Sequence, residues 1–402
     1  MEKRTSRETT LGASSQDVSK RGAHRTLFLR DTSCRRRGLD GRHVRSESDG
    51  TAAVPVCIYC GHPAGSDEHV IPSFLGEFSG FPHLKCRICG DCNNKFSKLE
   101  SQLAHSGPEA LMRTVVGIRG RRKHKKVNIF TEPSNGAQPI EVIFKDPSSE
   151  AQTLAQLQEG GAAELLPTVH AVDDDGHEAN IIFDGTIASG QQLLDHVREK
   201  GLKGTIRLGW MVQGPDRPLV ERMVDTIATK HTLSSWKHVE VPSTVPKMDV
   251  KFHFTEKYYR AIAKIAFHYM LAVCLDVMGS EECFGNLRHF IQYGGSKKQY
   301  VSPRRGTLLI VPGKKGPDYW SHMFMVQNER GRLTVSMQLF IGPTGSQAPA
   351  WEIHLNQVPA PHHIVTPTTG TVCSYVPRAD GSGYRCVTQP IPLIYLGEDV
   401  AQ

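Results

Sequence analysis

The sequence predicts an α+β protein with a small cysteine-bearing module near its N-terminus and a larger mixed α/β region after it. Three observations support this fold class. Two C-x2-C pairs lie in one short stretch. Apolar residues recur at helical spacing in several segments. After Tyr300 the chain consists mainly of strand-like runs bounded by turn residues.

The composition is typical of a globular protein without a membrane segment. Of the 402 residues, 39% are hydrophobic and 22% are charged. No stretch reaches the ~18 consecutive apolar residues that a membrane span requires, and the N-terminus lacks the apolar centre of a signal peptide. We therefore expect a cytoplasmic protein with no membrane partner.

Cysteine usage favours metal binding over disulfide bonding. Ten cysteines are too few for a disulfide scaffold in a chain of 402 residues, and five of them lie between positions 57 and 92. In a reducing compartment such clustering indicates a metal site. The other five are expected to be ordinary thiols: Cys34, Cys274, Cys283, Cys373 and Cys386.

Positive charge is confined to the N-terminal third. Residues 1–50 carry a net charge of +5, residues 51–126 another +5, and the remainder −3. A polyanion would be attracted to the first two segments. The run "RGRRKHKK" at 119–126 holds six Lys or Arg among eight residues, and it could face the same anionic ligand as the cysteine module. A solvated charge run is the alternative interpretation.

Composition divides the chain into four segments. Residues 1–52 are rich in Ser, Thr, Gly and Arg, which predicts a disordered basic tail. Residues 53–130 form the cysteine module with its basic extension. Residues 131–165 are interpreted as a linker region because Pro, Ser, Gln and Gly are frequent there. Residues 166–402 are interpreted as a mixed α/β domain of unknown role.

Two helices are expected within the cysteine module. Phe96, Leu99 and Leu103 share one face of a first helix. A second helix follows, with Pro108 in its first turn and Gly117 near its end.

The middle of the chain is expected to hold a hairpin at 168–183 and helices at about 190–200 and 217–230, with a strand between the helices. Asp173–Asp175, His177 and Glu178 lie at the hairpin turn. They could bind a cation, although a solvated turn is the favoured interpretation.

The strongest helix prediction covers residues 255–279, with Thr255 as N-cap and Gly279 as the stop. Its second half is apolar on nearly every face, so His268 is interpreted as a core or edge histidine. Strands are expected afterwards in "GTLLIV", "HMFMVQ", "RLTVSMQLFI", "WEIHL" and "PLIYL".

The chemistry of the sequence concentrates in the cysteine pairs. Cys57-x2-Cys60 and Cys89-x2-Cys92 are separated by 28 residues and offer four thiolates to a structural Zn2+. Cys86-x2-Cys89 is also a permissible pair. We favour Cys89 and Cys92 because "NNKF" then opens the helix. A four-sulfur site is closed, so His69 in "DEHVIP" is surplus to it.

The order C-x2-C, then EH-x-x-P, then C-x2-C-N resembles the HNH endonuclease superfamily, whose ββα-metal finger cuts nucleic acids. The match covers residues 54 to about 103. The residues that carry it are Cys57, Cys60, Glu68, His69, Pro72, Cys89, Cys92 and Asn93. The resemblance implies a metal-dependent endonuclease acting on DNA, with RNA as an open alternative, and restriction or phage defence as a role suggested by family analogy.

The resemblance also implies roles for individual residues. His69 would be the general base, and Glu68 and Asn93 would hold a catalytic Mg2+ or Mn2+ through oxygen ligands. Asn94 competes with Asn93 for this role. Phosphate contacts are expected from the following basic residues: Lys95, Lys98, Arg119, Arg121, Arg122, Lys123, Lys125 and Lys126.

The sequence departs from the family pattern at three points. The acid before the histidine is Glu68 where Asp is commoner, and Asn93 stands where His is frequent. The Asn that normally orients the catalytic histidine has no clear counterpart, and His83 is the nearest residue by position.

A rival interpretation is a non-catalytic, zinc-dependent module that binds nucleic acid or protein. Under either interpretation, the C-terminal region could provide target recognition or homo-oligomerisation.

Overall fold

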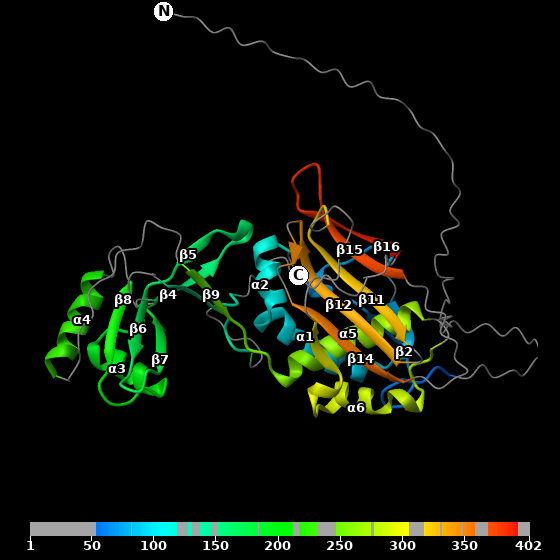
Figure 1. The fold of residues 1–402 in the computed structure, drawn as a ribbon, viewed down its shortest axis with the longest axis horizontal. Helices are drawn as coiled ribbons and strands as arrows, with labels where there is room; N and C mark the ends of the chain where they lie inside the picture. Colours follow the sequence, from blue (N-terminus) through cyan, green and yellow to red (C-terminus); the bar gives the residue numbers. More distant parts are fainter. Residues whose placement is uncertain are drawn as a thin grey trace, which may run out of the picture. The chain divides into compact units, whose positions relative to one another are not determined.

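The computed structural model describes residues 54–81, 83–118, 128–130, 137–145, 152–183, 185–211, 217–230, 247–274, 277–304, 317–329, 332–343, 345–346, 349–357 and 369–392. These residues form the expected α+β fold, in which helices are interspersed with sheets (Figure 1). All pairings between the named strands are antiparallel. Among the described helices, none has both the length and the apolar composition needed to cross a membrane.

The cysteine module is a short hairpin followed by two helices. Strands β1 (Ser66–His69) and β2 (His83–Ile88) pair across a loop that contains the short helix η1 (Ser73–Leu75). Helix α1 (Gly90–Ser106) buries the predicted face of Phe96, Leu99 and Leu103.

Helix α2 (Pro108–Val116) begins at the expected proline and ends at Gly117, whose left-handed φ of 78° permits the helix to stop there. Both helix predictions for this module are confirmed.

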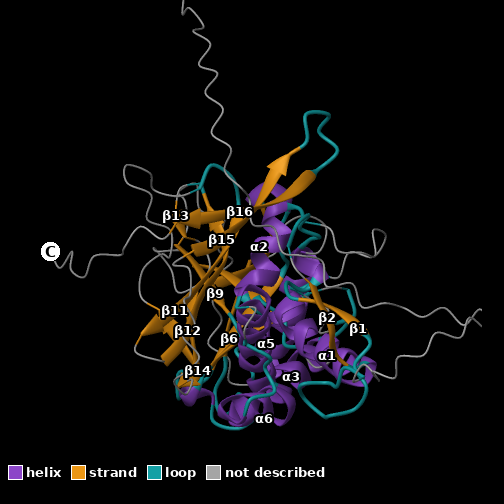
Figure 2. Ribbon diagram, turned by 90° about the vertical axis from the view of Figure 1, so that its right-hand side faces the viewer, coloured by secondary structure: helices purple, strands orange, loops and turns teal. Residues whose placement is uncertain are grey.

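Helix α5 (Glu256–Val273) lies against the largest sheet. The side chain of Thr255 accepts a hydrogen bond from the backbone N–H of Tyr258, which confirms the predicted N-cap. The helix ends at Val273, earlier than the predicted stop at Gly279. Nearly all residues of its second half are buried, because α5 contacts the sheet on one side and α1 and β2 on another (Figure 2).

The largest sheet has seven strands in the order β10-β14-β12-β11-β15-β16, with β13 paired to β12. Its strands are β10 (Val301–Arg304), β11 (Ser321–Glu329), β12 (Arg332–Gly342), β13 (Gly345–Ser346), β14 (Ala350–Gln357), β15 (Thr369–Pro377) and β16 (Tyr384–Pro392). The short helices beside it are η4 (Glu282–Phe284), α6 (Gly285–Tyr293) and η5 (Lys297–Gln299).

Three of the predicted strand runs became β11, β12 and β14. The hairpin of β15 and β16 was not predicted. All of "GTLLIV", and all of "PLIYL" except Pro392, lies outside the described residues.

The cysteine module and the large sheet share one hydrophobic core. That core contains Ile58 and Phe96 from the module, Phe267 from α5, and Phe324 and Tyr375 from the sheet. The linker expected at residues 131–165 therefore does not separate two independent cores. The module has too few apolar residues to bury its own surface, so α5 and the sheet complete its interior.

The loop between β1 and β2 also contacts the sheet directly. Tyr375 donates a hydrogen bond to the carbonyl oxygen of Leu75, and Ser79 forms an isolated parallel bridge with Val387. These two contacts tie the module to β15 and β16.

Residues 131–165, expected to be a linker region, contain three strands: β3 (Glu141–Lys145), β4 (Gln152–Leu157) and β5 (Ala163–Leu165). With β9 (Lys247–Lys251) they form a sheet in the order β5-β4-β3-β9. This sheet buries Ile140, Val142 and Ala155. The linker prediction is thus wrong over the described part of the segment, because β3 pairs with a strand far away in the sequence.

The middle of the chain forms a separate core. Strands β6 (Thr168–Val172), β7 (Glu178–Ile182) and β8 (Arg207–Met211) make a three-stranded sheet in the order β7-β6-β8. Helices α3 (Gly190–Glu199) and α4 (Arg217–Lys230) contribute to the same cluster of buried residues. The predicted hairpin and both helices are confirmed.

Candidate metal centre and active site

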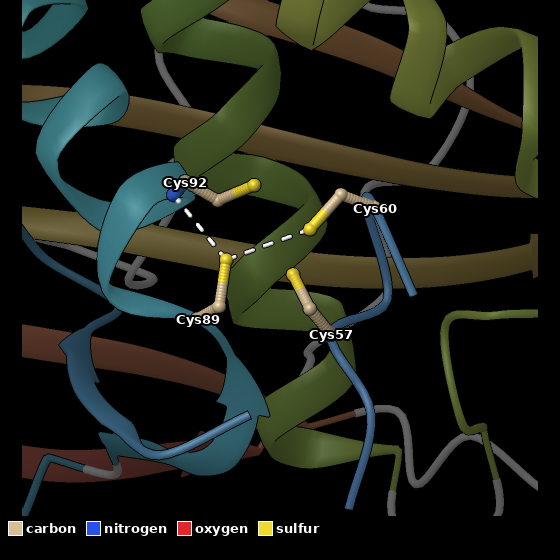
Figure 3. Close-up of side chains that lie close together, drawn as sticks. All are labelled: Cys57, Cys60, Cys89 and Cys92. Atoms are coloured by element: carbon tan, nitrogen blue, oxygen red, sulfur yellow. Dashed lines mark hydrogen bonds between the residues drawn. The ribbon is translucent and has the colours of Figure 1, made fainter. Parts of the chain in front are cut away.

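Four cysteines come together between the first loop of the module and the start of α1 (Figure 3). The sulfur atoms of Cys57, Cys60, Cys89 and Cys92 all lie within 4.8 Å of one another, and those of Cys60 and Cys89 are 3.5 Å apart. A tetrahedral Zn2+ with Zn–S bonds of about 2.3 Å places its sulfurs about 3.8 Å apart. The donor set and its geometry therefore fit a metal such as zinc.

Local backbone geometry brings these sulfurs toward one another. Gly61, with φ of 75°, reverses the chain after Cys60, and the N–H of Cys57 donates to the carbonyl of His62 at 2.7 Å. Cys89 is the N-cap of α1, and its sulfur accepts a hydrogen bond from the N–H of Cys92. Cys86 is not a member of the four-sulfur group, so the choice of Cys89 and Cys92 agrees with the structure.

The C-terminal part of the chain also contacts this group. Gln292, in the last turn of α6, donates its side-chain N–H to the sulfur of Cys92 at 3.8 Å. Burial raises the pKa of the Cys92 thiol, and the neighbouring Cys60 and Cys89 thiols raise it further. Since metals bind the thiolate, a bound cation would displace this proton.

The two faces of β1 have different surroundings. Successive side chains of a strand point to opposite sides. Glu68 faces inward and is 4% exposed, whereas the Asp67 side chain is 58% exposed. His69 is half-buried. The acid that shares the side of β1 with His69 is consequently Asp67, which the sequence interpretation had passed over in favour of Glu68.

Glu68 forms an ion pair inside the core. The ammonium group of Lys264, from α5, contacts the carboxylates of both Glu68 and Glu100 and donates to the carbonyl oxygen of His69 at 3.3 Å. Burial by itself would lower the pKa of Lys264, but Glu100 and Glu68 outweigh that effect and raise it. Burial also raises the pKa of Glu100.

His268 completes this inward cluster, which we define as Glu68, Glu100, Lys264 and His268. Its Nδ1 lies 3.8 Å from Glu68 Oε1, and its Nε2 is 2.9 Å from the hydroxyl of Tyr59. Burial lowers the pKa of His268 far below its usual value, and the adjacent Lys264 lowers it further. A neutral core histidine is therefore present here, in line with the sequence interpretation.

The outward face of the hairpin carries Asp67, His69 and His83, which we call the histidine face. His69 and His83 are direct cross-strand partners, with ring centroids 4.3 Å apart. Nδ1 of His83 is 3.0 Å from Asp67 Oδ1. A carboxylate at Nδ1 fixes the ring orientation and leaves Nε2 of His83 for other contacts. His83 thus lies beside His69.

The side chains of Asn93 and Glu68 bind different partners. Its side-chain N–H donates to the hydroxyl of Ser66, which ties the first turn of α1 to the start of β1. Among the described residues, only two groups of His, Cys, Asp or Glu have metal-binding spacing, and neither contains Glu68. The role of Glu68 and Asn93 as ligands of a divalent cation stays a prediction, and it requires both side chains to change partners.

The second of those groups is Asp173, Asp175 and His177. Asp173 is 1% exposed and accepts hydrogen bonds from the backbone N–H groups of Asp175 (3.0 Å), His177 (2.8 Å) and Lys203 (3.3 Å). These bonds account for the acid as part of the turn between β6 and β7.

The basic residues divide into two sets. Lys95 and Lys98 are exposed on α1. The remaining predicted phosphate contacts lie outside the described residues: Arg119, Arg121, Arg122, Lys123, Lys125 and Lys126.

No protein-family model, curated protein or solved structure matches this chain at a significant level.

Proposed function

We propose that this chain is a metal-dependent phosphodiester hydrolase of the HNH endonuclease type, with DNA as the expected substrate. The observation that supports it best is the histidine face. A zinc-compatible frame of four cysteines holds a hairpin on which His69 is partly exposed and lies beside His83 and Asp67.

In this proposal His69 accepts the proton of the attacking water. A histidine can do this at neutral pH because its unperturbed pKa is about 6.5, so much of it is neutral. His83 packs against the His69 ring and is itself held by Asp67, so the pair takes the place of the orienting Asn that the sequence lacks. Lys264 fixes the backbone of His69 through its carbonyl oxygen.

A divalent cation, when bound, would neutralise charge on the phosphate. Glu68 and Asn93 are the residues that the resemblance assigns to it. Glu68 is held by Lys264, and Asn93 is bonded to Ser66. Asp67 offers an exposed carboxylate on the same side of β1 as His69.

The test is plasmid nicking by the full chain with Mg2+ or Mn2+, using wild type, His69→Ala and His62→Ala. His62 is an exposed histidine of the same module and serves as the matched control. We expect His69→Ala to lower the rate at least about 100-fold, the usual contribution of a general base, and His62→Ala to cut like wild type. Parallel assays with single-stranded DNA and RNA identify the substrate.

One observation favours the rival, a non-catalytic zinc-dependent binding module: Lys264 occupies the carboxylate that a catalytic cation would need. An inactive wild-type protein that retains zinc and binds nucleic acid would support this rival and contradict the nuclease proposal. Equal loss of structure in His69→Ala and in a cysteine variant would show that His69 belongs to the metal cage.

A further inference from the structure

A small basic pocket lies where α1, α5 and α6 meet. It has a volume of about 220 Å³, and its lining includes Lys95 and Lys98 from α1, Lys257 and Arg260 from α5, and Gln292 from α6. Lys95 and Lys98 are predicted from the sequence to contact phosphate, whereas the residues from α5 come from a segment far along the chain.

The charge in this pocket is largely unbalanced. Within the described part of the chain, no acidic group lies within ion-pair distance of Lys95, Lys98 or Lys257, and all three are exposed. Arg260 donates to the carbonyl oxygens of Ile291 and Gln292 and lies 3.6 Å from Glu256. Basic side chains gathered at the edge of one small pocket repel one another, and an anion would relieve that repulsion.

The pocket lies on a different side of α1 from the contact with the hairpin. Asn93 faces Ser66 of β1. At about 100° per residue, Lys95 and Lys98 are turned about 200° and about 140° away from Asn93 around the helix axis. The lysines therefore do not share the helix face that meets β1, and an anion bound to them is separate from the histidine face.

We propose that this pocket binds a phosphate group through Lys95, Lys98 and Lys257, with Gln292 as a neutral donor at its edge. The phosphate is carried either by a polynucleotide backbone or by a free phosphate ion, since both present the same anionic oxygens. This inference does not depend on catalysis by His69, because it holds for a nuclease and for a binding module.

A competing explanation is that the lysines balance the anionic zinc–thiolate group, whose Cys92 also borders the pocket. Zinc content distinguishes the two. Lysines that only balance the thiolates would affect zinc retention and leave phosphate binding unchanged.

The experiment uses the zinc-loaded full chain and four variants: Lys95→Gln, Lys98→Gln, Lys257→Gln, and Lys200→Gln as control. Lys200 is an exposed lysine at the end of α3, in the separate middle core. Binding of a fluorescein-labelled single-stranded DNA oligonucleotide is measured by anisotropy over a range of salt concentrations. Binding of inorganic phosphate is measured by calorimetry, and zinc is measured by mass spectrometry.

We expect each pocket variant to bind at least one of these probes about three- to tenfold more weakly than the control and to keep its zinc. For the oligonucleotide, the dependence of log K on log salt should also flatten by about 0.7 for each lysine removed. An effect on the oligonucleotide alone assigns the pocket to backbone phosphate, and an effect on phosphate assigns it to the free ion. Pocket variants that bind both probes like Lys200→Gln, or that lose zinc without losing binding, would overturn the proposal.

Discussion

The inward and outward faces of β1 differ in burial and in the partners of their side chains, although the residues of the two faces alternate along a strand of only four residues. On the outward face, Asp67 is exposed and His69 is half-buried, and both contact His83. On the inward face, Glu68 is buried and paired with Lys264. The stretch "DEH" is thus divided by strand geometry: the inward acid holds the module to α5, and Asp67 and His69 lie on the opposite face beside His83.

Removing the metal frame should have the largest effect, because both faces of β1 depend on it. We expect Cys92→Ser to lose zinc and to unfold the module, since zinc binding in small modules contributes ~10 kcal/mol or more to folding. Metal content and limited proteolysis measure this. Cys283→Ser, outside the four-sulfur group, is the control. A Cys92→Ser protein with full zinc and unchanged protease resistance would contradict the assignment.

Breaking the inward cluster should have the next largest effect. Lys264→Met leaves the buried carboxylates of Glu68 and Glu100 without their cation, which should lower the free energy of unfolding by about 3–5 kcal/mol. Chemical denaturation measures it. Lys257→Met, on the same helix but exposed, should change stability by less than about 0.5 kcal/mol. Equal stability of the two variants would show that the buried ion pair does not form.

A second buried acid offers a sharper contrast with Glu68, because its partner is not a cation. Tyr258 donates its hydroxyl to Glu109, at 3.0 Å from Oε1 and 3.1 Å from Oε2. Burial raises the pKa of Glu109 to about 7 from its ordinary value of 4.5. Between these two values the folded state keeps the Glu109 proton and the unfolded state loses it. The free energy of unfolding therefore falls as the pH rises from about 4.5 through about 7.

Glu109→Gln should therefore be nearly neutral at pH 5 and stabilising at pH 8, by up to about 3 kcal/mol. Denaturation midpoints of the variant and wild type at both pH values measure the difference. A variant that is equally destabilised at both pH values would mean that Glu109 is ionised in the folded protein.

The smallest effect on stability is expected on the outward face. Asp67→Asn keeps an acceptor for His83 Nδ1 and removes one exposed charge, so stability should change by less than about 0.5 kcal/mol. Glu68→Gln, one residue later, should cost several times more because it weakens the buried pair with Lys264. If the two substitutions cost the same, the two faces are not energetically distinct.

Local sequence signals predicted individual elements well. The apolar spacing of Phe96, Leu99 and Leu103 placed α1, and Pro108 with Gly117 bounded α2, because caps and helical periodicity act over a few residues. Thr255 marked the start of α5 for the same reason. The pairing of strands that lie far apart in the sequence was not predicted. The segment that contains β3 was expected to be a linker, yet β3 lies between β4 and β9 in a sheet.

The sequence by itself predicted the four-cysteine group, because each C-x2-C pair brings two sulfurs together through its own local turn. Only the approach of one turn to the other depends on the rest of the fold. The sequence also predicted that His69 is surplus to that group. Tertiary structure decided that Asp67 lies on the same side of β1 as His69, and that Lys264 pairs with Glu68. Lys264 lies 195 residues after His69, and no local pattern links them. Burial made the pairing of Glu68 with Lys264 necessary, since a carboxylate enters a core only with a compensating charge.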